Sequence, residues 1–207
     1  MNSHRRQRLA AATPVRALRR VVVLAVPPVE ELDIVGPWEV FTTANSALLG
    51  KRGGYDVELV TTNRHRLFTG DSGLSLLAKR RYNHLRGEVD TLIVPGGTGP
   101  QRMRDPAVLK WVKSMARKAR RVVSICTGAF LLAEAGILNG RSATTHWMFA
   151  QDFAQRYPRV TVEPDRIYVQ DGHVYTSAGV TAGMDLSLAL VEEDVGSASR
   201  RCRGTLR

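Results

Sequence analysis

Residues 122–136 read Val-Val-Ser-Ile-Cys-Thr-Gly-Ala-Phe-Leu-Leu-Ala-Glu-Ala-Gly. The apolar run at the start is typical of a buried strand that stops at Cys126, and the residues after it are typical of a helix. Small residues stand two positions before the cysteine (Ser124) and two positions after it (Gly128), which is the spacing of a nucleophile elbow. The stretch therefore predicts a tight strand-to-helix turn that lifts Cys126 into a pocket.

Outside this stretch, strand-like and helix-like segments alternate along the chain. The alternation predicts an α/β fold, in which a mostly parallel sheet is covered by helices on both faces. We expect strands at 20–26, 55–61, 90–94, 121–125, 160–162, 167–170 and 173–176, and a small hairpin within 67–77. We expect helices at 36–49, 105–120 (with Asp105 as N-cap), 127–135, 144–157 and 181–193.

The positive charge of the chain is concentrated at its two ends. The 207 residues carry a net charge of +11. Residues 1–20 contain six arginines and 197–207 contain four, without any acid, whereas 21–196 hold 20 basic and 19 acidic residues. We therefore expect a basic, disordered tail over 1–18, one domain over 19–196 and a basic, irregular tail over 197–207. Such tails attract polyanions but do not read a nucleotide sequence.

Other features of the composition narrow the class of protein. The longest apolar run, 21–29, is shorter than the roughly 20 residues that a membrane-spanning helix needs. Two cysteines, Cys126 and Cys202, cannot form a disulfide framework, which favours a reducing compartment. These features predict a cytoplasmic protein without a membrane partner.

The candidate site residues follow predicted strands. Ligands of open α/β sheets bind beyond the carboxyl ends of the strands, so side chains that follow different strands meet at one edge. Four such ends carry unusual residues: Asp33, Gly96-Gly97, Cys126-Thr127 and Thr145-His146.

Two of these strand ends suggest a reacting centre. A helix that begins just after Cys126 would favour the thiolate, which we would expect to be alkylated selectively. The alternative is that Cys126 is a small buried hydrophobic residue. The backbone amides of Gly97 and Thr127 could form an oxyanion hole, although a plain tight turn explains Gly96-Gly97 equally well.

The other two strand ends carry ionisable side chains. Asp33 could exchange a proton with the thiol, or could simply cap a helix. A lone histidine such as His146 is more often structural than catalytic. The sequence contains neither metal-ligand spacing nor a phosphate-binding or dinucleotide-binding glycine motif, so we expect no metal and no cofactor.

Together these segments resemble the PfpI superfamily of class-I glutamine-amidotransferase-like proteins, and within it the amino-terminal domain of AraC-type (GlxA-like) transcriptional regulators. The similarity spans about 19–196 and is carried by 31–41, 94–97, 126–147 and 176–186. The resemblance implies a flavodoxin-like sandwich that usually forms a homodimer.

The resemblance also assigns roles to individual residues. It makes Cys126 the elbow cysteine, Asp33 its neighbouring acid and His146 the pocket histidine, and it places the amides of Gly97 and Thr127 in the oxyanion hole. Asp185, in Ala-Gly-Met-Asp, matches an acid that recurs in this subgroup. The protease-like members carry histidine where this chain has Thr127, and the His-x-Glu of true amidotransferases is not found. Peptidase and glutamine amidotransferase activities are therefore not expected.

Two functions fit this resemblance. The preferred one is a domain that senses a small, nitrogen-containing molecule for a transcriptional regulator. The alternative is a cofactor-free enzyme like isonitrile hydratase, in which Cys126 attacks the isonitrile carbon and Asp33 handles the proton.

The carboxyl end of the chain departs from the AraC-type pattern. Those regulators continue past 191–196 into helix-turn-helix motifs, whereas this sequence continues only as a short basic stretch without helical apolar periodicity. We expect a truncated or frameshifted regulator that does not bind specific DNA by itself.

Overall fold

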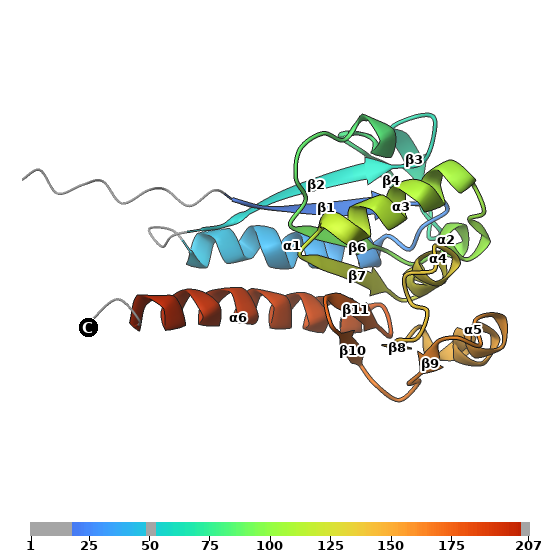
Figure 1. Ribbon diagram of the computed structural model, residues 1–207. Helices are drawn as coiled ribbons and strands as arrows, with labels where there is room; N and C mark the ends of the chain where they lie inside the picture. Colours follow the sequence, from blue (N-terminus) through green and yellow to red (C-terminus); the bar gives the residue numbers. More distant parts are fainter. Residues whose placement is uncertain (1–17, 49–52, 204–207) are drawn as a thin grey trace, which may run out of the picture.

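A computed structural model describes residues 18–48 and 53–203 (Figure 1). The tails expected at 1–18 and 197–207 therefore fall largely outside the described residues, apart from Leu18 and the backbone of 197–203. Strands and helices alternate between these limits.

The centre of the molecule is a seven-stranded sheet with the order β10-β11-β7-β6-β1-β2-β5. All neighbouring strands are parallel except β10 and β11, which form an antiparallel edge. The bounds of the sheet strands are β1 Arg19–Ala25, β2 Tyr55–Thr61, β5 Arg80–Arg81, β6 Thr91–Val94, β7 Arg121–Ile125, β10 Tyr168–Asp171 and β11 Val174–Ser177. Two small two-stranded sheets pair β3 Leu67–Thr69 with β4 Ser75–Leu77, and β8 Ser142–Ala143 with β9 Thr161–Val162.

Helices cover both faces of the sheet, which confirms the predicted fold class (Figure 1). On one face, α1 and α6 lie side by side over alternate residues of β1 such as Val21 and Val23. On the other face, α3 and α4 pack over Val22 and Leu24. The helix bounds are α1 Leu32–Ala47, η1 Tyr82–His84, α2 Thr98–Arg102, α3 Pro106–Lys118, α4 Gly128–Glu134, η2 Trp147–Phe149, α5 Ala150–Arg156 and α6 Thr181–Arg203.

Several predicted elements are confirmed closely. The strands at 55–61 and 121–125 have the predicted bounds, and the expected hairpin forms from β3 and β4. Asp105 caps α3 by accepting a hydrogen bond of 2.8 Å from the amide of Ala107, with Pro106 in the first helical position. The helix expected at 144–157 is shorter: a 3-10 turn, η2, precedes α5.

The start of α1 corrects a prediction. The helix begins at Leu32 rather than at Gly36, and Pro37 lies inside it. A proline inside a helix lacks the amide that would bond to the carbonyl four residues earlier, and its ring crowds that carbonyl, so proline favours the first turn of a helix. Asp33 therefore lies within the first turn of α1 and does not cap the helix.

The end of α6 corrects a second prediction. The helix continues past Glu193 to Arg203, through most of the stretch that was expected to be irregular. Residues 197–203 contain neither proline nor glycine and include three arginines and one alanine, which have high intrinsic helix propensity. Apolar periodicity detects only a helix that buries a face, so it missed this extension.

Among the described helices, none is both long enough and apolar enough to cross a bilayer.

Candidate functional site around Cys126

The elbow expected from the spacing of small residues is present between β7 and α4. Cys126 follows the last residue of β7 and has a φ of 56°, a left-handed conformation that is rare outside glycine. Gly128 is needed because a Cβ at that position would lie 2.1 Å from the carbonyl oxygen of Val94. The strained turn fixes the direction of the cysteine side chain, which is 7% exposed.

Two glycines from distant segments leave room for the cysteine. A Cβ added at Gly96 would lie 2.7 Å from the Cβ of Cys126 and 2.8 Å from an oxygen of Asp33. A Cβ added at Gly179 would lie 2.9 Å from the sulfur. Gly96 was a predicted site residue, whereas Gly179 was missed. Gly179 could have been found from its position two residues after the end of a strand, β11, which adjoins β7.

Asp33 is fully buried beside the cysteine, as predicted. One carboxylate oxygen accepts a hydrogen bond of 3.0 Å from the amide of Gly96, and the other accepts one of 3.1 Å from the amide of Val180. Burial raises the pKa of Asp33 to about 7, although these hydrogen bonds oppose the shift. Val180, also missed by the sequence analysis, has a φ of 50°, so a second strained residue holds the carboxyl group.

The protonation of Cys126 corrects a prediction. Burial, reinforced by the negative charge of Asp33, raises the pKa of Cys126 to about 12, although the backbone amide of Thr127 opposes the shift. The short helix α4 was expected to favour the thiolate, but desolvation and the neighbouring carboxylate outweigh its dipole. The surroundings of Cys126 therefore favour the thiol at neutral pH.

The expected oxyanion hole is occupied by a side chain. The amide of Gly97 donates a hydrogen bond of 2.8 Å to the hydroxyl oxygen of Thr127, which in turn donates one of 2.9 Å to the carbonyl oxygen of Gly97. The two residues do meet at the site, as predicted. However, the Gly97 amide is engaged by Thr127 and is not open to a substrate oxygen.

The remaining two candidates, His146 and Asp185, lie on other segments of the chain. His146 is half-buried; its Nδ1 accepts a hydrogen bond of 3.3 Å from the amide of Met148, and its ring stacks on Trp147. The hydroxyl of its neighbour Thr145 donates a hydrogen bond of 2.9 Å to the carbonyl oxygen of Cys126, which holds this segment against the elbow. Asp185 is exposed on α6, and within the described residues no hydrogen bond or ion pair joins it to Asp33 or Cys126.

The tip of the β3–β4 hairpin closes over the segment that carries Asp33. The carboxylate of Glu31 accepts hydrogen bonds of 2.7 Å from the hydroxyl of Ser72 and 3.0 Å from the amide of Leu74. On the other side of the tip, the side chain of Asp71 accepts a hydrogen bond of 3.0 Å from the amide of Thr98, next to Gly97. In the described parts of the chain, no group of three or more histidine, cysteine or acidic residues could hold a metal ion.

Alkylation of Cys126 tests its protonation. In a Cys202→Ser background, iodoacetamide at pH 7 should modify Cys126 about a thousandfold more slowly than free cysteine, because a pKa near 12 leaves far less thiolate than the usual value of about 8.5. Mass spectrometry of samples quenched over time gives the rate, and the same protein in denaturant should react at the rate of free cysteine. A native rate at or above that of free cysteine would mean that the thiolate is held.

Comparisons with known proteins give a family match over most of the chain. A model of the DJ-1/PfpI family matches residues 19–193. The chain is 35% identical to isonitrile hydratase of Pseudomonas putida over 174 residues, which is 84% of this chain and 71% of that protein. It is 39% identical to the HTH-type transcriptional regulator CdhR of Pseudomonas aeruginosa over 107 residues, which is 52% of this chain but only 32% of the regulator.

Solved structures share the fold. A ThiJ/PfpI family protein from Pseudomonas syringae superposes with a TM-score of 0.72 at 25% identity, over 92% of this chain and 76% of that chain. An AraC family transcriptional regulator from Pseudomonas putida gives a TM-score of 0.72 at 21% identity, over 84% of this chain and 91% of that chain, which is a likeness of fold.

Proposed function

This chain belongs to the DJ-1/PfpI family, and from that premise we propose that residues 19–196 are a small-molecule-binding sensor domain of the type that precedes the DNA-binding part of AraC-type regulators. The similarity to CdhR supports this function and covers about a third of that regulator. Homodimerisation, which is usual for this type of domain, is part of the proposal.

The observation that carries the proposal is that the polar groups of the site already form hydrogen bonds within the protein. The Gly97 amide bonds to Thr127, and both oxygens of Asp33 accept backbone amides. The cysteine is a buried thiol. Donors already paired in this way do not stabilise a developing oxyanion. They can, however, exchange partners with a bound molecule.

Asp33 favours a ligand that bears nitrogen. A carboxyl group with a pKa of about 7 can hold or release a proton near neutral pH. An N–H group or a small cation can replace one of its backbone donors, and the charge of the carboxylate strengthens that hydrogen bond. Because Cys126 and Asp33 are buried, the ligand must be small.

A second candidate function, isonitrile hydration, is favoured by the match to isonitrile hydratase, which extends over 84% of this chain. In this reaction the S–H bond of Cys126 adds across the terminal isonitrile carbon and gives a thioimidate. Water then adds to that carbon, and departure of the thiol releases an N-substituted formamide. Asp33, which hydrogen-bonds to the thiol, would carry the proton between these steps.

Two assays on the purified full chain separate the functions. For the sensor we expect no Cys126-dependent formamide from cyclohexyl isonitrile, measured by chromatography against a Cys126→Ala control. A screen of small amines and amides should contain a compound that raises the melting temperature by roughly 5–10 °C at a hundredfold excess over its Kd, which corresponds to about 2.7 kcal/mol.

The variants locate the binding site. The shift in melting temperature should disappear in Thr127→Val and Asp33→Asn and persist in Asp185→Asn, because Asp185 is exposed on α6. Cys126-dependent turnover of the isonitrile would instead establish the enzyme. Retention of the shift in Thr127→Val and Asp33→Asn would place the ligand elsewhere.

A further inference from the structure

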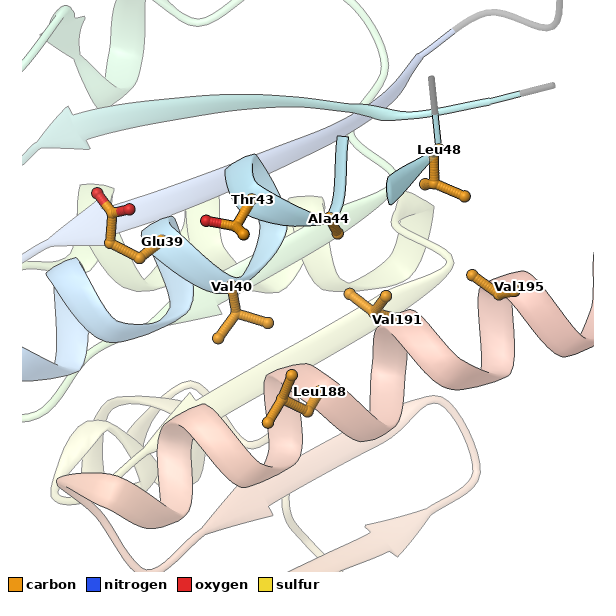
Figure 2. Close-up of a pocket in the computed structure, with 8 residues that line it drawn as sticks. All are labelled: Glu39, Val40, Thr43, Ala44, Leu48, Leu188, Val191 and Val195. Carbon is orange, nitrogen blue, oxygen red and sulfur yellow. The ribbon is translucent and has the colours of Figure 1, made fainter. Parts of the chain in front are cut away.

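An apolar groove runs between α1 and α6, away from the site around Cys126. Its volume is about 520 Å³. Val40 on α1 faces Leu188 and Val191 on α6, and Leu48 and Val195 lie together at one end (Figure 2). Two of these side chains are strongly exposed for aliphatic residues, Leu188 at 56% and Val195 at 40%. Exposed apolar surface of this kind commonly marks a contact site.

The charged side chains on the two helices around the groove are acidic over 32–47 and 181–196, although the chain as a whole is strongly basic. The sequence of α1 and residues 181–196 of α6 contain no lysine or arginine. Glu39 lines the groove, and Glu39, Asp185 and Glu192 are all exposed on these two helices. The chain nevertheless carries a net charge of +11. A cationic segment with apolar residues complements such a surface better than a second copy of the same acidic rim.

This chain contains such a segment in the residues before Leu18, the first residue that the structure describes. Residues 1–17 include four arginines (Arg5, Arg6, Arg8 and Arg16), no acidic residue, and the apolar residues Leu9 and Val15. The segment ends at Leu18, whose side chain lies beside Asn45: a Cβ added at Gly54 would lie 3.0 Å from the first and 2.9 Å from the second. Asn45 belongs to α1 and follows Ala44, which lines the groove.

The length of the segment is sufficient. The groove extends along α1 from Glu39 to Leu48, a rise of nine residue steps or about 14 Å at 1.5 Å per residue. A chain of 17 residues spans up to about 55 Å, so it reaches the far end of the groove with length to spare.

We propose that residues 1–17 bind in the α1–α6 groove of their own chain. Leu9 and the alanines after it cover the apolar floor, and the arginines pair with Glu39, Asp185 and Glu192 on the rim. This interaction does not depend on the proposed sensor function, because the groove contains none of the residues around Cys126.

Photo-cross-linking in the full chain tests this proposal. With p-benzoylphenylalanine in place of Leu9, most cross-links should fall on 39–48 and 188–195, mapped by mass spectrometry. A 1:1 mixture of isotopically heavy and light protein should give only heavy–heavy and light–light products. The matched control carries the same photoreactive residue in place of Leu77, which is 63% exposed on β4, and should not label the groove.

Charge variants test the recognition of the rim. Glu39→Lys at this exposed position, and separately the triple variant Arg5→Gln, Arg6→Gln, Arg8→Gln, should each reduce the groove cross-links at least fivefold in 50 mM salt. Cross-links outside the groove, or an absence of intramolecular cross-links, would overturn the proposal. Heavy–light products would place a second copy in the groove, and a yield insensitive to both charge variants would refute recognition through the arginines.

Discussion

Between pH 5 and pH 8 the titration of Asp33 alone should lower the free energy of unfolding of this protein by about 2.5 kcal/mol. The pKa of this carboxyl group is raised by burial from 3.8 to about 7. Over the interval between these values the folded state retains a proton that the unfolded state has released. Stability therefore falls as the pH rises through 7, which is the reverse of the usual behaviour of an ion-paired aspartate.

Asp33→Asn should abolish this component, because asparagine does not titrate. Urea unfolding at pH 5, 6, 7 and 8 gives the free energies, and the difference between wild type and Asp33→Asn cancels the other groups. Asp185→Asn, an exposed change on α6, should leave the slope of the wild type unchanged. Parallel pH profiles for wild type and Asp33→Asn would show that Asp33 is already ionised at pH 5.

We could predict the strands, helix caps and site residues that depend on local sequence. The strand at 121–125, the elbow at Cys126 and the cap at Asp105 follow from side-chain types at fixed spacings. The meeting of Asp33 with Cys126 follows from the rule that parallel strands end at one edge of the sheet. Each of these predictions needed only the order of residues and a topology that the alternation of elements implied.

The electrostatic state of the site could not be predicted in the same way. The pKa of Cys126 depends on how completely its surroundings exclude water and on the carboxylate of Asp33, which is remote in the sequence. The amide of Val180 reaches Asp33 across 147 positions, and Gly179 limits the space at the sulfur. From the spacing of residues one can predict that a helix follows the strand, and hence the effect of its dipole on Cys126. The spacing does not show how deeply Cys126 is buried, and this burial outweighs the dipole.

The far end of the sheet holds a buried charge cluster that fixes α6. Asp194 is 3% exposed, and its Oδ2 lies 2.9 Å from a guanidinium nitrogen of Arg121, at the start of β7. Tyr55 donates a hydrogen bond of 2.9 Å to the same carboxylate, and Arg120 lies 3.1 Å away. Although burial opposes it, the attraction of Arg121 and the other arginines keeps the pKa of Asp194 below its usual value.

Asp194→Ala should therefore destabilise the protein by about 3–5 kcal/mol at pH 7, because it leaves the 4%-exposed Arg121 without its buried counter-charge and with only the exposed Glu193, 2.7 Å away, to pair with. Asp185→Ala, at an exposed position on the same helix, is the matched control. It should change the free energy of unfolding by less than about 0.5 kcal/mol, apart from the gain that alanine brings through its higher helix propensity. The double change Arg121→Met, Asp194→Leu should recover much of the loss, since removing both charges also removes the cost of burying one of them unpaired. Guanidinium unfolding measures all three. A loss below 1 kcal/mol for Asp194→Ala would mean that α6 is held to the sheet by its apolar face, with the ion pairs only balancing their own desolvation.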